Sequence, residues 1–289
     1  MQVAVRIRLE RGYYLIIGKG LYVKKYQIYS PKLPLSFDGV RIIFISDLHG
    51  KIYGKENSTL IEMIDKAKPN YIFIGGDMVV GGEKCIDISR KTLDTAVELL
   101  SKLSKKYRIF HALGNHEEKL CQALWQEYKS ALLDMNITLL DNDKYSLISD
   151  EDEVIDVYGL SLGMDFYPKF KRKVLMLDDI NNRVGMKGEN FSVLMAHSPI
   201  YFKTYSEWGA DLTLSGHLHG GIMRLPFIGG VIGPDFFVFP KYSGGVYKED
   251  GKTMVVSCGA GMHTINLRIF NPPEITLVEL KFGEKINGN

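Results

Sequence analysis

The sequence contains few cysteines, and their positions argue against two kinds of protein. Cys85, Cys121 and Cys258 are the three cysteines, and no two of them form a Cys-x-x-Cys pair. This spacing argues against a disulfide framework and against a zinc site built from thiolates. It also favours a reducing compartment, so we predict a cytoplasmic protein.

Long apolar runs are missing as well. The run Tyr13–Gly18 (YYLIIG) has six residues, whereas a helix that crosses a bilayer needs about 20. It is also too short for the core of a signal peptide, and no small-residue cleavage site follows it. We therefore predict neither a transmembrane helix nor a signal peptide. Peripheral contact with a membrane is the alternative that stays open.

The sequence has no excess of charge of one sign. Its 289 residues carry a formal net charge of +2, with 36 Lys and Arg against 34 Asp and Glu. A dedicated nucleic-acid-binding protein concentrates positive charge, so the composition does not indicate that function. The 45% of hydrophobic residues suffice for a large core. The composition does not predict an oligomeric state.

Five apolar runs are typical of buried strands, and each ends at residue types that bind metals. The runs are Arg41–Ser46 before Asp47 and His49, Tyr71–Gly76 before Asp77, Arg108–Gly114 before Asn115 and His116, Phe191–Ala196 before His197, and Leu212–Ser215 before His217 and His219. Helical patterns lie between them at Ser58–Lys68, Ile86–Ser104 and Glu117–Met135. Alternating strands and helices predict parallel β-α units in one domain. All five polar clusters are then expected at the carboxyl edge of a sheet.

These clusters supply carboxylates and imidazoles but no thiolate. Such a set suits Mn, Fe, Zn or Co better than Mg²⁺, which prefers oxygen ligands and water. The candidate ligands are Asp47, His49, Asp77, Asn115, His197, His217 and His219. They are too many for one ion but suit two ions about 3.5–4 Å apart, the usual arrangement for displacement at phosphorus. Taken singly, Asn115 could instead cap a helix, and His197 could be a histidine at a turn.

The order D-x-H, G-D, G-N-H-E, a lone histidine and G-H-x-H resembles the calcineurin-like metallophosphoesterase superfamily over about residues 38–280. The resemblance implies an α/β fold, a four-layer α/β/β/α sandwich of two mixed sheets flanked by helices. The ligand sets that it implies are Asp47, His49, Asp77 and His219 for the first ion, and Asp77, Asn115, His197 and His217 for the second. Asp77 would bridge the two ions, and Glu117 would sit behind the ligands.

The resemblance also implies a metal-dependent phosphoric ester hydrolase, most closely a phosphodiesterase. A hydroxide that bridges the ions would attack phosphorus directly. His116 would not bind metal but would act as general acid or stabilise the transition state, and Asn115 would also contact substrate. Mn²⁺ is the expected metal, with Fe, Zn or Co as alternatives. His263, which follows a late strand, is a further candidate substrate contact.

Three segments, SPKLPLSFDGVRIIFISDLHG, HGGIMRLPFIGG and NPPEITLVEL, resemble the YkuE/YaeI-like phosphodiesterases, a bacterial branch. This branch implies a lipid-linked or nucleotide-sugar diester as substrate, such as UDP-2,3-diacylglucosamine. The sequence departs from the branch at Leu218, Ile222 and Cys258, where Thr, Gln and Arg are usual, and it shows no N-terminal hydrophobic anchor.

Other functions stay open on the same residues. They are a phosphomonoesterase or protein phosphatase, a nuclease, and a metal-binding scaffold without catalysis. For the domain organisation we predict N-terminal strands at residues 1–37 that pack on the domain, a metallophosphoesterase domain at residues 38–282, and a flexible tail at residues 283–289.

Overall fold

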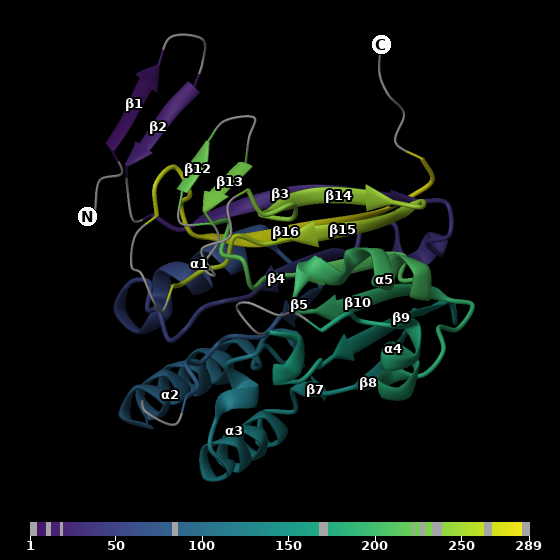
Figure 1. The fold of residues 1–289 in the computed structure, drawn as a ribbon, viewed down its shortest axis with the longest axis horizontal. Coiled ribbons are helices and arrows are strands. Elements are labelled where there is room, and N and C mark those ends of the chain that lie inside the picture. The colour runs from purple at the N-terminus through teal and green to yellow at the C-terminus, as the bar shows by residue number, and fades with distance from the viewer. Residues whose placement is uncertain are drawn as a thin grey trace.

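Two six-stranded β-sheets lie face to face at the centre of the protein, and helices cover their outer faces (Figure 1). The computed structural model describes residues 5–9, 13–17, 20–82, 86–167, 173–221, 223–225, 229–232, 239–262 and 268–284.

The first sheet has the strand order β3-β16-β4-β5-β6-β7. Its strands are β3 (Tyr22–Ser30), β4 (Arg41–Ile45), β5 (Tyr71–Ile74), β6 (Arg108–Ala112), β7 (Thr138–Leu140) and β16 (Glu274–Phe282). Strands β4 to β7 are parallel to one another. Strand β16 is parallel to β3 and antiparallel to β4, so the sheet is mixed.

The second sheet has the strand order β14-β15-β11-β10-β9-β8. Its strands are β8 (Asp143–Ile148), β9 (Val154–Leu160), β10 (Phe191–Ala196), β11 (Leu212–Ser215), β14 (Gly245–Glu249) and β15 (Lys252–Val256). The four inner strands are parallel, and both edge strands run antiparallel to their neighbours. Two separate antiparallel pairs are β1 (Val5–Leu9) with β2 (Tyr13–Ile17), and β12 (Met223–Leu225) with β13 (Gly229–Ile232).

The helices form the outer layers. The α-helices are α1 (Ser58–Ala67), α2 (Ile86–Leu103), α3 (Gln122–Asp134), α4 (Leu177–Val184) and α5 (Phe202–Trp208). Short 3-10 helices lie at Leu35–Phe37, Lys55–Asn57, Glu117–Lys119, Met164–Phe166 and Pro199–Tyr201. Helices α1, α2 and α3 pack on the first sheet, and α4 and α5 pack on the second. The predicted α/β fold of two mixed sheets flanked by helices is confirmed.

Strand β4 shows how the sequence builds these layers. Ile43 and Ile45 pack with the helices on one face of the sheet. Ile42 and Phe44 point to the opposite face, where they pack against the second sheet. Because successive side chains of a strand alternate between faces, a strand covered on both sides needs a continuous apolar run. This explains why Arg41–Ser46 lacks polar alternation.

Two details of the sequence prediction are wrong. The five predicted strands exist, but they do not share one sheet: β4, β5 and β6 belong to the first sheet, and β10 and β11 to the second. The helix predicted at Glu117–Met135 is divided, because Leu120 and Cys121 are extended and separate a 3-10 helix from α3.

Among the strands that the structure describes, β1 and β2 pair only with each other, whereas β3 is the edge strand of the first sheet. The domain boundaries at residues 37 and 282 stay a prediction. No helix in the described ranges combines the length and the apolar character that crossing a membrane requires.

His111 of β6 gives a prediction about acid stability. Its imidazole is fully buried, with Nε2 2.8 Å from the Tyr128 hydroxyl of α3. Burial lowers the pKa of His111 from 6.5 to about 4. Between pH 6.5 and about 4, His111 is protonated in the unfolded chain but neutral in the folded protein. The free energy of unfolding therefore falls as the pH drops through this range. This shift corresponds to about 3 kcal/mol of unfolding free energy.

We expect His111→Gln to flatten this acid dependence, because glutamine keeps a polar atom near Tyr128 but does not titrate. Urea unfolding at several pH values between neutrality and pH 4 measures the effect. Tyr128→Phe, which leaves the imidazole in place, is the control and should keep the wild-type slope. The prediction is contradicted if the unfolding free energy of His111→Gln falls with decreasing pH as steeply as that of the wild type.

Candidate metal centre

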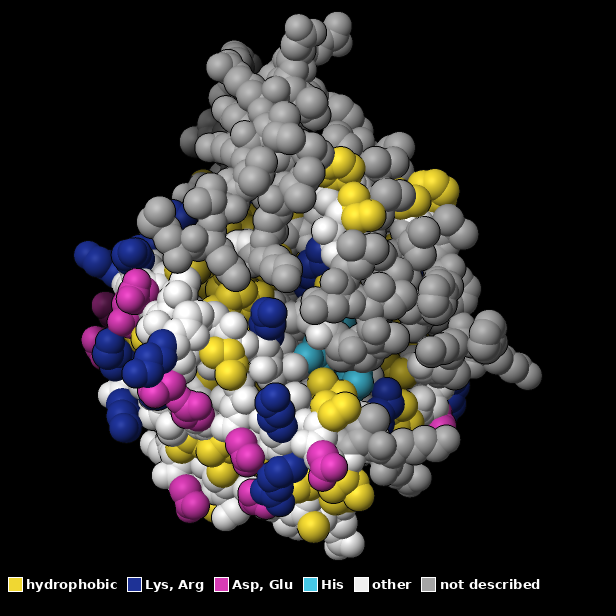
Figure 2. Space-filling view, turned by 90° about the vertical axis from the view of Figure 1, so that its left-hand side faces the viewer, with side chains coloured by type: hydrophobic (Ala, Val, Ile, Leu, Met, Phe, Trp, Pro, Cys, Tyr) yellow, Lys and Arg dark blue, Asp and Glu magenta, His cyan; other side chains and the backbone are white. Residues whose placement is uncertain are grey.

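The loops after β4, β5, β6, β10 and β11 bring the seven predicted ligands together. These residues are Asp47, His49, Asp77, Asn115, His197 and His219, all buried, and the half-buried His217. Histidine side chains are visible at the centre of the face shown in Figure 2, so the cluster reaches the surface there. Strands of both sheets end at this point, which explains why loops from different sheets contribute.

Three groups of side-chain atoms lie close enough together to hold a metal ion, and one of them, His49, Asp77 and His116, links the other two. Atoms of Asp47, His49 and His219 lie within 4.8 Å of one another, and so do atoms of Asp77, His197 and His217. Asp77 Oδ2 lies 3.1 Å from His197 Nε2 and 3.9 Å from His49 Nε2. One carboxylate thus faces both groups, the placement needed for a ligand shared between two ions.

Two buried side-chain atoms that could bind a metal ion have no hydrogen-bond partner. They are Asn115 Oδ1 and His197 Nε2. His197 Nε2 lies 3.1 Å from Asp77 Oδ2, so it is an ion-pair partner of Asp77 when the ring is protonated and lacks a partner only as the neutral ring. A buried polar atom without a partner costs about 1–3 kcal/mol, and a bound cation would satisfy both atoms. The residues therefore fit a metal ion on this side of Asp77.

Three of the four candidate histidine ligands are held in place through their ring nitrogen Nδ1. His49 Nδ1 lies 3.2 Å from the Val79 carbonyl oxygen, His197 Nδ1 lies 2.7 Å from that of Gly75, and His219 Nδ1 lies 3.3 Å from that of Gly261. A carbonyl accepts only from a protonated nitrogen, so each ring keeps Nε2 as its basic atom. Histidines that bind metals are usually oriented in this way.

The backbone around the cluster is strained. Asp47, His49, Asp77, His217 and His219 all have positive φ, between 49° and 69°. A non-glycine residue in this region costs on the order of 1–3 kcal/mol and persists where the surroundings or a function require it. Five such residues at five candidate ligands indicate that the fold gives up stability to aim these side chains.

Glycines next to the ligands allow them to approach one another. A Cβ at Gly114 would lie 2.3 Å from Asp77 Oδ1, and a Cβ at Gly216 would lie 2.3 Å from Asp47 Oδ2. Only glycine leaves room at these two places. The glycines in G-N-H-E and G-H-x-H are therefore part of the site.

Glu117 fixes the backbone at Asp77. Its carboxylate accepts hydrogen bonds from the N–H groups of Asp77 (2.7 Å), Met78 (2.8 Å) and Gly114 (3.0 Å). Burial, with the negative charge of Asp77, raises the pKa of Glu117 to about 7. This placement behind the ligands agrees with what the resemblance implied.

The charges of the cluster call for cations. Burial opposes the ionisation of Asp77, but the charge of His197 holds the pKa of Asp77 well below its usual range. In turn, burial opposes protonation of His197, but Asp77 raises the pKa of His197 to about 10. In the absence of metal, a proton on His197 thus offsets the carboxylate charge, and a divalent ion would replace it.

His116 lies beside the cluster. Its ring centroid is 4.9 Å from that of His49, and its Nδ1 accepts a hydrogen bond from the Gly81 N–H at 3.1 Å. In the neutral ring the proton must then be on Nε2. Burial lowers the pKa of His116.

The loop at Gly261 and the side chain of Arg268 support the metal centre. The sequence did not assign this role to them. The Gly261 N–H donates to the Asp47 carbonyl at 2.6 Å. The Gly261 carbonyl faces His219 and also accepts from Arg268 Nη2 at 2.6 Å. Asn271 donates to the His219 carbonyl at 2.6 Å. The sequence favoured Arg268, like the nearby His263, only as a candidate substrate contact and not as a support of the centre. His263 itself lies outside the described residues.

A model of the calcineurin-like phosphoesterase family matches residues 40–221 of the chain. The metallophosphoesterase YkuE of Bacillus subtilis is 28% identical over 259 residues, which cover 89% of this chain and 84% of that protein. The phosphodiesterase YaeI of Escherichia coli is 24% identical over 244 residues, which cover 83% and 82%. The crystal structure of TT1561 from Thermus thermophilus superposes with a TM-score of 0.46 at 9% identity, over 77% of this chain and 92% of that one.

Proposed function

The chain belongs to the calcineurin-like phosphoesterase family, and from this premise we propose that it hydrolyses phosphodiesters at a centre of two divalent metal ions. The family supports a metal-dependent phosphoric ester hydrolase. The preference for diesters is the finer part of the proposal, and it is supported by the similarity to the phosphodiesterase YaeI.

We assign four residues to each ion. The sets are Asp47, His49, Asp77 and His219 for one ion, and Asp77, Asn115, His197 and His217 for the other. The observation that carries the proposal is the position of Asp77 Oδ2, which lies 3.1 Å from His197 Nε2 and 3.9 Å from His49 Nε2. Asn115 adds a buried oxygen without a hydrogen-bond partner. Carboxylates and imidazoles without thiolate favour Mn²⁺, Fe, Zn or Co, and we propose Mn²⁺.

When bound, two such metal ions hold the phosphate oxygens, lower the pKa of the attacking water and offset the charge of the transition state. The residues of the chain supply position and a proton. Glu117 holds the backbone of Asp77 in place. We propose that His116 donates its Nε2 proton to the leaving oxygen, since its Nδ1 already accepts from Gly81. Asn115, next to His116, is proposed to contact the substrate as well.

Removing metal tests this proposal. We expect chelated protein to lose activity on bis-p-nitrophenyl phosphate by at least about 100-fold, because chelation removes the ions that would activate the water and hold the phosphate. Adding Mn²⁺ should restore the activity. Metal at about 1,000 times its Kd should also raise the unfolding free energy by about 4 kcal/mol. Turnover of the diester should exceed that of p-nitrophenyl phosphate.

Several results would change the conclusion. Protein that neither binds metal nor hydrolyses either ester would be the scaffold alternative. Faster turnover of the monoester would indicate a phosphomonoesterase. A nuclease would show salt-sensitive binding of DNA.

Arg268 gives a prediction about metal affinity. Its Nη2 bonds the Gly259 and Gly261 carbonyls, and the latter orients His219. We expect Arg268→Gln to weaken metal binding by about 10–100-fold, the usual effect of removing a group that orients a ligand. Metal titration followed by calorimetry measures it, and Arg268→Lys should recover part of the affinity. Unchanged affinity in Arg268→Gln would show that the loop holds His219 unaided.

For the physiological substrate we propose a lipid-linked or nucleotide-sugar diester such as UDP-2,3-diacylglucosamine, and for the location the cytoplasm, with peripheral membrane contact. The proposal is supported by the resemblance of three segments to the YkuE/YaeI-like branch and by the scattered cysteines. A screen of nucleotide, phospholipid and UDP-sugar-lipid diesters on metal-loaded protein tests it. The substrate proposal fails if no lipid-linked or nucleotide-sugar diester is turned over faster than the remaining diesters of the screen.

A further inference from the structure

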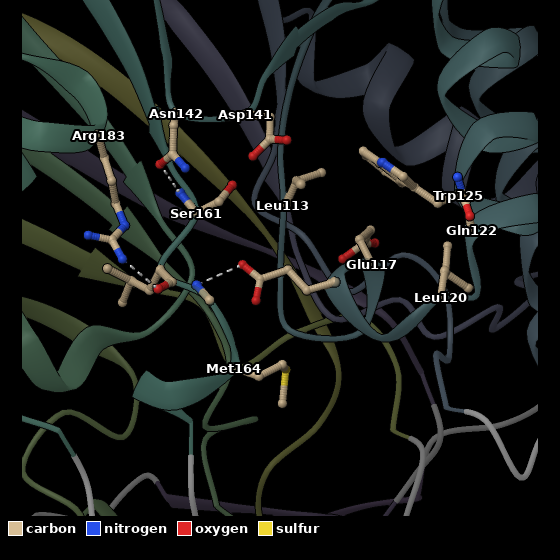
Figure 3. Close-up of a pocket in the computed structure, with 13 residues that line it drawn as sticks. Leu113, Glu117, Leu120, Gln122, Trp125, Asp141, Asn142, Ser161, Met164 and Arg183 are labelled. Carbon is tan, nitrogen blue, oxygen red and sulfur yellow. Dashed lines mark hydrogen bonds between the residues drawn. The ribbon is translucent and has the colours of Figure 1, made fainter.

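A second site is indicated by a cavity of about 620 Å³ next to the metal centre (Figure 3). Leu120, just before α3, and Gln122 and Trp125, at its start, line one side of it. Asn142 and Ser161 line the opposite side, after β7 and β9. Sites for small ligands typically have volumes of about 300–1,000 Å³ and a few polar groups among apolar walls. The volume of the cavity lies in this range, and polar side chains make up about half of its lining.

Two polar atoms at this cavity have no partner in the protein. Ser161 is 6% exposed, and its buried Oγ makes no hydrogen bond. Figure 3 shows this side chain directed towards the middle of the cavity. Glu118 accepts a bond from the Gly163 N–H with Oε1 at 3.1 Å, but its buried Oε2 has no partner. Each unmet group costs about 1–3 kcal/mol, so a ligand that supplies hydrogen-bond donors would be stabilised here.

The lining of the cavity is acidic. It contains the carboxylates of Glu117, Glu118 and Asp141 and the single guanidinium of Arg183. Arg183 is engaged by the protein, since Nη1 donates to the Asp179 carbonyl at 2.7 Å and Nη2 to the Leu162 carbonyl at 3.2 Å. Burial raises the pKa of Glu118, and the charge of Asp141 adds to this effect. The cavity therefore repels phosphates and carboxylates and attracts a cation.

The remaining groups select the kind of cation. A metal ion is not favoured, because Glu117 already binds three backbone N–H groups and the described carboxylates do not converge into a cluster of donors here. The indole of Trp125 offers an aromatic face to an organic cation. Hydroxyl groups of a ligand would pair with Ser161, Asn142 and Gln122. We propose that this cavity binds a hydroxylated primary amine, up to the size of an amino sugar.

Fluorescence of Trp125 tests the proposal directly. Trp125 and Trp208 are the two tryptophans of the chain, so Trp208→Phe leaves the reporter in the cavity wall. We expect glucosamine, at neutral pH where most of its amine is charged, to give a saturable change in emission. Glucose, which has the same ring but no ammonium group, should bind at least about tenfold more weakly, because it cannot pair with Glu118.

Variants link the signal to the acidic lining. Glu118→Gln keeps an acceptor for Gly163 and should weaken glucosamine at least about tenfold while leaving glucose unchanged. Glu62→Gln, an exposed position on α1 outside the cavity, is the matched control and should bind as wild type. Calorimetry on the wild-type protein gives the same comparison of sugars if Trp208→Phe does not fold.

Equal binding of glucosamine, glucose and N-acetylglucosamine, or no binding of glucosamine, would overturn the proposal. Undiminished binding in Glu118→Gln would overturn the role of Glu118. Because the readout is binding in this cavity, it does not depend on hydrolysis at the metal centre. Activity without amine binding would refute the second site alone.

Discussion

Asp77→Asn is expected to lower kcat on bis-p-nitrophenyl phosphate by on the order of 10³, while the protein stays folded. Asparagine removes the charge that faces both groups of donor atoms. It keeps an oxygen that can accept the hydrogen bond from the His116 N–H, which Asp77 Oδ1 accepts at 2.8 Å. The Asp77 N–H remains bonded to Glu117. The fold therefore has little reason to change, and the loss should appear in metal content and kcat.

Three measurements separate these effects: kcat, bound metal by elemental analysis, and thermal unfolding of the chelated protein. Asp87→Asn removes the same charge at an exposed position of α2 and should behave as wild type. The assignment of Asp77 fails if the variant keeps wild-type turnover at saturating metal. A collapse of stability in the chelated state would instead mean that Asp77 is chiefly structural.

The candidate ligands could be predicted from the sequence because two local rules placed them. Apolar runs such as Arg41–Ser46 identify strands buried on both faces, and polar residues directly after such strands lie at the carboxyl edge. The division of the strands into two sheets does not follow from these rules. It depends on pairings between strands far apart in the sequence, such as β16 with β3 and β4 in the first sheet and β11 with β15 in the second. Pairing over such a separation leaves no local signal.

The supporting residues were harder to predict for the same reason. Glu117 is close in sequence to Asn115, but its role is to bond the backbone of Asp77, 40 residues earlier. Arg268 and Asn271 act on His219 from a segment that local patterns do not connect to it. The positive φ angles at the ligands also have no sequence signal, because the residues involved are not glycine. Contacts of this kind become visible only in the folded chain.

His116→Ala is expected to lower kcat by about 10²–10⁴ on a diester with a poor leaving group, with bound metal retained. The alanine variant removes the proton that Nδ1 bonding to Gly81 assigns to Nε2. It leaves all the assigned metal ligands in the chain and keeps the backbone N–H that bonds Asp77. A general acid matters less when the leaving oxygen is already stable. The loss should therefore be smaller on bis-p-nitrophenyl phosphate than on an alkyl diester.

His116→Gln sharpens the test, because its amide can donate a hydrogen bond but cannot transfer a proton. Partial recovery by glutamine on both substrates, with equal losses in the alanine variant, would show that His116 stabilises charge in the transition state. No recovery, together with a loss that grows as the leaving group becomes more basic, would establish proton transfer. Full activity in both variants would remove His116 from the reaction, and the burial that lowers its pKa would then be only a consequence of packing beside His49.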